Sequence, residues 1–386
     1  MKLSEILTHL GEERDHYFQA VAPPIIQTSN FAFKDTASFR AAFLDERSHH
    51  LYTRGNNPTT EILRRKLAAL EKTEDCLVFS SGAAAMSCGV LANIKHGDHV
   101  ICIKNPYSWT NKLVSKMLPR FGVDHTFISG EDISEFQRVI TTRTRLLILE
   151  SPNSITYGVQ DLEGYAQLCH KHQIVSIIDN TYASPLFQNP VDYGIDLIMH
   201  TCSKYLNGHS DVVAGALCGT REMMDKIFAS ELMTLGSILS PNDASLIIRG
   251  IRTLALRMER VSNTALEVAR FLESHPKVEQ VMHPLLPSFP QHHLARKQMK
   301  GAGGLFSFLV KTDSKEAVNK MVDNLKCFLL AVSWGGHESL VLPFSIFHDM
   351  PNRQNPPYQF NLIRLYIGLE DADYLISDLE QALEVI

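Results

Sequence analysis

Short apolar runs separated by helix-like stretches dominate the first two thirds of the sequence. Short apolar runs of three to six residues, spaced by helices, are typical of strands that are buried on both faces of a mostly parallel sheet. The pattern therefore predicts an α/β core. The runs are Cys76–Phe79, Val100–Ile103, Leu146–Leu149, Ile174–Ile178, Leu197–Met199 and Val212–Leu217.

The regions on either side of this core have other patterns, so we predict three parts. Residues 1–57 are polar and rich in turn residues, which indicates an arm. Residues 58–245 form the α/β domain, and an amphipathic helix over Thr59–Glu71 opens it. Residues 246–386 form a smaller α+β domain. Its expected elements are one long helix or two successive helices between Leu246 and Leu272, strands over Leu305–Val310 and Leu362–Ile367, and helices over Lys315–Leu325 and Asp371–Glu384.

Composition excludes several classes of protein and partner. The chain has 386 residues, of which 45 % are hydrophobic and 20 % charged, and its formal net charge is −5. This balance predicts a soluble globular protein and gives no electrostatic reason to expect a nucleic acid or an anionic membrane as partner. The acidic N-terminus is unlike a signal peptide, and no apolar run approaches the roughly 18 residues of a membrane span. We expect a cytoplasmic protein.

Common phosphate-binding and metal-binding motifs are absent from the sequence. No G-x-G-x-x-G follows a predicted strand, and no P-loop motif occurs. His337-Glu338 begins like a zinc-protease motif, but Val341 stands where the second histidine would be. The seven cysteines are scattered without a C-x-x-C pair, which favours buried thiols over disulfides or zinc ligands. The sequence therefore predicts no metal site.

Two charged residues stand at the ends of predicted buried strands. Asp179 ends the run that begins at Ile174, at the edge of the sheet where open α/β folds bind ligands. Lys204 follows the next run, beside two hydroxyl residues. A lysine among apolar elements is uncommon unless it is paired or used covalently. Asp179 alone could be an ordinary turn residue, and the lysine is what makes a chemical site the better interpretation.

The arrangement of these residues resembles the pyridoxal-phosphate enzymes of cysteine and methionine metabolism, the trans-sulfuration enzymes. The resemblance extends from Tyr52–Thr59 through Asp179-Asn180-Thr181 and Thr201–Asp211 to Leu362–Asp371. It implies the fold of type I pyridoxal-phosphate enzymes, which is similar to aspartate aminotransferase, and pyridoxal 5'-phosphate as cofactor. It also implies a homotetramer built from dimers with shared active sites.

By this resemblance three residues carry the chemistry. Lys204 would bind the cofactor aldehyde covalently and, once released by the substrate, move the α-proton. Asp179 would keep the pyridine nitrogen protonated, because a carboxylate stabilises a neighbouring cation. Tyr107 would stack on the cofactor ring and assist proton transfer or departure of the leaving group, although a half-buried aromatic without such a role would look the same.

The resemblance also assigns residues to the cofactor phosphate. Backbone N–H groups at a helix N-terminus suit an anion, and hydroxyl and guanidinium groups add donors. Two of these residues would come from a neighbouring subunit, so a monomer would lack a complete site. The phosphate ligands would be Gly82, Ala83, Thr201 and Ser203, with Tyr52 and Arg54 supplied by the neighbour.

The substrate would be a small amino acid whose carboxylate binds Arg364. Strand alternation places Arg364 on one face with Leu362 and Tyr366, and a guanidinium on an apolar strand requires a partner. A structural ion pair would also meet that requirement. By the resemblance, Ser154, Ser333 and Trp334 would complete the substrate site.

Residues at the far end of the pocket indicate the subtype. Glu150–Ile155 and the Trp334 segment resemble bacterial cystathionine β-lyases, and Val332 stands where γ-acting members usually carry a glutamate. We therefore expect a carbon–sulfur β-lyase that converts cystathionine to homocysteine, pyruvate and ammonia, with cysteine or cystine as further substrates. The second hypothesis is a cystathionine γ-synthase, a γ-lyase or an O-acylhomoserine sulfhydrylase. The third is a non-catalytic binding protein with this fold.

Overall fold

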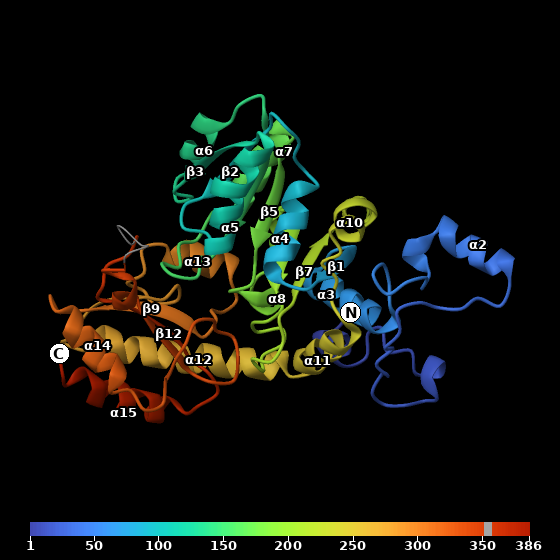
Figure 1. The fold of residues 1–386 in the computed structure, drawn as a ribbon. Helices are drawn as coiled ribbons and strands as arrows, with labels where there is room; N and C mark the ends of the chain where they lie inside the picture. Colours follow the sequence, from blue (N-terminus) through green and yellow to red (C-terminus); the bar gives the residue numbers. More distant parts are fainter. Residues whose placement is uncertain (351–356) are drawn as a thin grey trace.

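The computed structural model describes residues 1–350 and 357–386. Within these residues the chain forms two β-sheets (Figure 1). The larger has the order β1-β7-β6-β5-β4-β2-β3, and the smaller has the order β10-β11-β12-β9-β8. The strands of the larger sheet are β1 (Asp75–Phe79), β2 (His99–Ile103), β3 (Asp124–Ile128), β4 (Thr144–Glu150), β5 (Val175–Asp179), β6 (Leu197–Thr201) and β7 (Gly215–Gly219).

The smaller sheet belongs to the C-terminal part of the chain. Its strands are β8 (Val278–Met282), β9 (Leu305–Val310), β10 (Leu329–Leu330), β11 (Leu340–Pro343) and β12 (Leu362–Tyr366). The predicted α/β fold, with a larger sheet and a smaller C-terminal one, is confirmed.

Helices cover both faces of the larger sheet (Figure 1). The helices in this part of the chain are α3 (Pro58–Glu71), α4 (Gly82–Leu91), α5 (Ser108–Lys112), α6 (Ile133–Val139), α7 (Leu162–His172), α8 (Ser184–Phe187), α9 (Arg221–Ile227) and α10 (Met233–Leu235). The other helices are α1 (Leu3–Thr8), α2 (Thr36–Leu44), α11 (Pro241–Arg252), α12 (Leu254–Ser274), α13 (His292–Gln298), α14 (Lys315–Asp323) and α15 (Ala372–Leu383).

Burial on both faces explains why the strands are apolar throughout. In β4, Leu147 and Leu149 belong to the core on one face, together with Leu63 of α3. Leu146 and Ile148 belong to the core on the other face, with Met86 of α4. Parallel pairing of β2, β4, β5 and β6 brings the carboxyl ends of these strands to one edge. β7 pairs antiparallel with both β6 and β1, so the sheet is mixed.

The expected long helix between Leu246 and Leu272 is two helices, as one of the two sequence alternatives proposed. α11 ends at Arg252 and α12 begins at Leu254. The guanidinium of Arg257 donates to the carbonyl oxygens of Gly250 and Tyr205, both at 2.8 Å. A buried cation thus adds a hydrogen bond to a carbonyl near the end of α11, and it ties the junction to the loop that carries Lys204.

The N-terminal residues lie in two different environments. α1 packs on α3, where the buried Lys66 pairs with Glu12 at 3.2 Å. α2 projects from the body of the molecule (Figure 1), and Phe43 and Leu44 at its end are exposed. Among the described residues, no helix is both long and apolar enough to cross a membrane.

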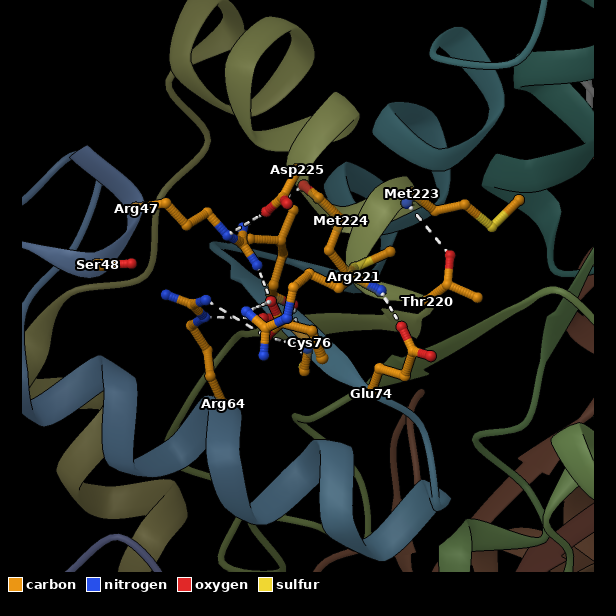
Figure 2. A network of polar contacts seen from close by, with 12 residues as sticks. Arg47, Ser48, Arg64, Glu74, Cys76, Thr220, Arg221, Met223, Met224 and Asp225 are labelled. Atoms are coloured by element: carbon orange, nitrogen blue, oxygen red, sulfur yellow. Dashed lines mark hydrogen bonds and ion pairs between the residues drawn. The ribbon is translucent and has the colours of Figure 1, made fainter. Parts of the chain in front are cut away.

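An arginine network fastens the segment that follows α2 to the larger domain (Figure 2). Arg47 binds the carboxylate of Asp75 and lies 2.8 Å from that of Asp225. Arg64 and Arg221 also approach Asp75, at 3.4 Å and 3.8 Å. Because Asp75 opens β1 and Arg64 belongs to α3, the network joins this segment to the sheet and to its covering helix.

Candidate active site

The carboxyl ends of β4 and β5 place two acidic side chains next to each other. Glu150 and Asp179 are register partners on these parallel strands, and both are buried. The Asp179 carboxylate accepts hydrogen bonds from the Thr181 backbone N–H, at 3.0 Å, and from the Thr181 hydroxyl. Burial raises the pKa of Asp179, and these hydrogen bonds, together with His200 and Lys204, oppose the rise.

Lys204 lies in the loop after β6, close to a loop of the smaller domain. Its ammonium group donates a hydrogen bond to the Ser333 hydroxyl and lies 5.3 Å from the centre of the Trp334 ring. Burial and the nearby Arg364 guanidinium lower the pKa of Lys204 to about 8, although Asp179 opposes this shift. A fraction of the side chain is therefore a neutral amine near neutral pH, which is the form that can act as nucleophile or base.

Ser333 connects Lys204 with Arg364. The Arg364 guanidinium, on β12, donates to the Ser333 carbonyl oxygen at 3.4 Å. The backbone of this loop is unusual, since Ser333 has φ of 81° and Gly335 has φ of 92°. A Cβ on Gly335 would lie 2.8 Å from the Lys204 Cα, so only glycine allows the loop to pack this closely on the lysine.

The N-terminus of α4 lies beside the end of β6. The N–H groups of Gly82 and Ala83 and the Thr201 hydroxyl together form a group of hydrogen-bond donors, the α4 cradle. Ser81 caps the helix by accepting from the Ala84 N–H at 3.1 Å, and the N–H groups of Gly82 and Ala83 lie in the first turn, which has no intrahelical acceptors. A Cβ on Gly82 would lie 2.1 Å from the Thr201 hydroxyl oxygen. Glycine is thus required here, because it lets a hydroxyl donor and a helix N-terminus converge.

Ser203 has other partners in this structure. Its hydroxyl accepts from the Ala214 N–H at 2.9 Å and lies 3.4 Å from the Ala214 carbonyl oxygen. These contacts fix the loop between Lys204 and β7. The predicted contact of Ser203 with the cofactor phosphate remains a prediction.

Tyr107 and Ser154 come together through Glu150, a residue that the sequence analysis did not assign to the site. The Glu150 carboxylate accepts from the Tyr107 N–H at 2.6 Å and from the Ser154 N–H at 3.1 Å. Burial and Asp179 raise the pKa of Glu150 to about 8, and burial and both acids raise that of Tyr107. One signal could have identified Glu150, since it ends a buried strand as Asp179 does.

Tyr52 and Arg54 lie on the arm and are exposed. The Arg54 guanidinium lies 5.6 Å from the centre of the Tyr52 ring. Among the residues that the structure describes, no hydrogen bond or ion pair joins either side chain to the other predicted cofactor residues of the same chain. The chain thus brings together Lys204, Asp179, the α4 cradle, Ser333, Trp334 and Arg364, and leaves this pair outside.

The donor set fits pyridoxal phosphate. The α4 cradle offers N–H and hydroxyl groups to an anion, and Lys204 offers an amine to an aldehyde. Burial raises the pKa of both Glu150 and Asp179, and a cationic group placed beside this pair would favour their ionised forms and be stabilised by them in turn. A protonated pyridine ring with a phosphate and an aldehyde meets all three requirements.

Comparison with known proteins agrees with this fit. The family profile described as "Cys/Met metabolism PLP-dependent enzyme" matches residues 4–384. The chain belongs to this family. Its cofactor is pyridoxal phosphate, as the sequence resemblance predicted.

Relatives of the Cys/Met metabolism family refine the prediction of subtype. An L-methionine γ-lyase of Treponema denticola is 39 % identical over 383 residues, which are 97 % of this chain and 95 % of the relative. A cystathionine γ-synthase of Mycobacterium leprae is 37 % identical over 376 residues, again 97 % and 95 %. The crystal structure of metB from Corynebacterium glutamicum has a TM-score of 0.91 and 33 % identity, and the match covers 100 % of this chain and 98 % of that one. These names support the γ-acting alternatives of the sequence analysis better than its main interpretation, the β-lyase.

Proposed function

We propose that the protein is a γ-lyase that cleaves the carbon–sulfur bond of methionine or homocysteine. With methionine and water the products would be methanethiol, 2-oxobutyrate and ammonia. Val332, next to the Ser333 that contacts Lys204, is the observation that favours this substrate class. It is 70 % exposed, and its aliphatic side chain suits an apolar thioether tail, whereas it cannot pair with the distal ammonium group of cystathionine.

The names of the relatives support the γ-reaction. The local segments around Ser154 and Trp334 had favoured the β-reaction, as had Val332, which stands where γ-acting members usually carry a glutamate. We give the relatives greater weight because they match this chain over nearly its whole length. A cystathionine γ-synthase is the second candidate, since relatives with that name are nearly as similar.

In this proposal each residue has a defined task. Arg364 binds the substrate carboxylate with its planar guanidinium, and Ser333 keeps the distance between Arg364 and Lys204 fixed. Lys204, as the neutral amine, accepts the proton from the substrate Cα. The ammonium group that results can later return a proton to the substrate. The raised pKa of Tyr107 keeps its phenol protonated at neutral pH, so it can donate a proton to the departing thiolate.

Asp179 and the α4 cradle would hold the cofactor ring and phosphate. When bound, pyridoxal phosphate supplies the electron sink for negative charge that develops on the substrate carbons. The exposed Tyr52 and Arg54 would reach the phosphate of a neighbouring subunit, within a homotetramer built from dimers.

The test is product identification with the purified holoenzyme. Methionine, homocysteine and cystathionine are supplied separately, and the keto acid is identified by mass spectrometry. We expect 2-oxobutyrate from methionine, and a loss of about a thousand-fold or more in rate for Lys204→Ala, which removes both nucleophile and base. Pyruvate from cystathionine, without turnover of methionine, would restore the β-lyase interpretation.

A variant of Val332 tests the role of this residue in substrate preference. Val332→Glu adds a carboxylate on the exposed rim without changing any residue that touches Lys204. It should raise the preference for cystathionine over methionine about five-fold, because an exposed ion pair contributes at most about 1 kcal/mol. An unchanged preference would show that Val332 does not select the substrate.

A further inference from the structure

Glu150 is the buried acid that the proposed reaction does not use directly. Both of its carboxylate oxygens are engaged, one with the Tyr107 N–H at 2.6 Å and the other with the Ser154 N–H at 3.1 Å. These two residues lie in separate loops, one before α5 and the other after β4. One rigid side chain thus spans two loops that border the same site.

The geometry argues against a purely space-filling role. Glu150 lies at the end of β4, next to Asp179, where an acid is costly because both groups are withdrawn from water. Among the described residues, no cationic side chain forms an ion pair with Glu150, and its hydrogen bonds come from the Tyr107 N–H and from the Ser154 N–H and hydroxyl. Within the protein, this acid is therefore bonded to the two loops and not to a cation. Hydrogen bonds from two N–H groups to one carboxylate are short and directional, so they fix the separation of the loops.

We propose that Glu150 is a positioning residue, which holds the Tyr107 ring against the cofactor and the Ser154 loop against the substrate at one fixed separation. This inference rests on the proposed active site, in which Tyr107 stacks on the cofactor. It follows that loss of either hydrogen bond changes the orientation of Tyr107 and weakens substrate use, while Lys204 still captures the cofactor.

Glu150→Gln tests this proposal. The amide has the shape of the carboxylate but only one acceptor oxygen, so its NH2 group meets one of the two N–H donors. The two enzymes are compared above pH 8, where Glu150 is ionised. We expect kcat/KM to fall about ten- to hundred-fold, the range typical of an unsatisfied buried donor. We also expect the visible circular dichroism band of the bound cofactor to change, since it reports the surroundings of the ring. The stoichiometry of bound cofactor should stay the same.

Glu12→Gln is the matched control, because Glu12 is also a buried acid with several partners but belongs to the N-terminal segment. It should lower thermal stability and leave kcat/KM and the dichroism band unchanged. A Glu150→Gln enzyme with wild-type kcat/KM and dichroism would overturn the proposal. So would losses of activity in both variants that simply follow their melting temperatures.

The role of Glu150 can still be decided if Glu150→Gln does not fold or if the wild-type enzyme is inactive. If Glu150→Gln does not accumulate as folded protein, Glu150→Asp keeps the charge but retracts it by one methylene, and the same changes in kcat/KM and dichroism are expected. If the wild-type enzyme turns over none of the sulfur amino acids, the proposed function fails. The dichroism of the bound cofactor still decides the role of Glu150 in that case.

Discussion

At the scale of single residues, the site depends on how Lys204 is kept partly neutral. Burial and the Arg364 guanidinium both lower its pKa, and Ser333 holds the two side chains in a fixed relation. The same arginine would bind the substrate carboxylate. Arg364 therefore has two roles, lowering the pKa of Lys204 and binding the substrate carboxylate. One substitution of Arg364 tests both, because the first role is measured by a pH midpoint and the second by kcat/KM.

Arg364→Ala should raise the pKa of Lys204 above about 8, because a like charge is removed. The neutral amine is the reactive form, so capture of pyridoxal phosphate by the apoprotein should shift to higher pH. Visible absorbance recorded between pH 6 and 10 measures this midpoint. We also expect kcat/KM to fall about a hundred-fold, as a charge-assisted hydrogen bond to the carboxylate is lost.

Arg260→Ala is the control for this experiment, since Arg260 pairs with Asp371 at the surface. It should change neither the midpoint nor the rate. An unchanged midpoint in Arg364→Ala would show that burial alone sets the state of Lys204.

Sequence reasoning assigned Asp179 and Lys204 to the site but not Glu150, and the reason is physical. Asp179 ends one buried apolar run and Lys204 follows the next, so the two charges stand out when they are taken together. Glu150 acquires its meaning only when β4 and β5 pair and two loops converge on it. Such contacts between distant segments are not encoded in local spacing. The sequence also shows no sign of the close approach of Gly335 to Lys204, because these residues are far apart along the chain.

At the scale of elements, the apolar runs predicted strands where both faces are buried. β3 was missed because only its last residue, Ile128, is buried, so it lacks a continuous apolar run. β7 begins at Gly215, three residues after the predicted start at Val212. The apolar runs also could not predict the direction in which strands pair. The antiparallel pairing of β7 with β1 and β6 depends on the path of the chain between these strands.

The arginine network of Figure 2 gives a prediction at this scale. Arg47→Ala removes a side chain that binds Asp75 and Asp225 and lies over the Phe228 ring at 5.2 Å. Asp75 would keep Arg64 as a partner, so no buried charge is left alone. We expect the free energy of unfolding to fall by about 2 kcal/mol, within the range for charged hydrogen bonds. Hydrogen exchange should rise over residues 45–57.

Arg143→Ala is the comparison variant, since its ion pair with Asp124 at 2.7 Å is exposed on both sides. It should cost less than about 1 kcal/mol. Equal losses in the two variants, measured by urea denaturation, would mean that the network does not anchor the arm.

At the scale of the whole molecule, the chain is built to present part of its arm outward. The network fastens residues near Arg47 to the body, while Tyr52 and Arg54 a few residues later are exposed and contact each other. Anchoring on one side and exposure on the other suit a segment that completes a neighbouring subunit's site. The exposed Phe43 and Leu44 beside it would be covered in the same assembly.

Subunit complementation tests this arrangement. Lys204→Ala lacks the nucleophile but has an intact arm, and Arg54→Ala lacks the arm's cation but keeps Lys204. When the two are co-expressed with different tags and purified through both, each mixed pair should contain one intact site. Because one of the two sites in each mixed dimer is intact, roughly half of the wild-type activity per site should return. Lys204→Ala paired with the Lys204→Ala/Arg54→Ala double variant should stay inactive, because no intact site can form. If the first mixture is equally inactive, each subunit completes its own site and Arg54 does not act across the interface.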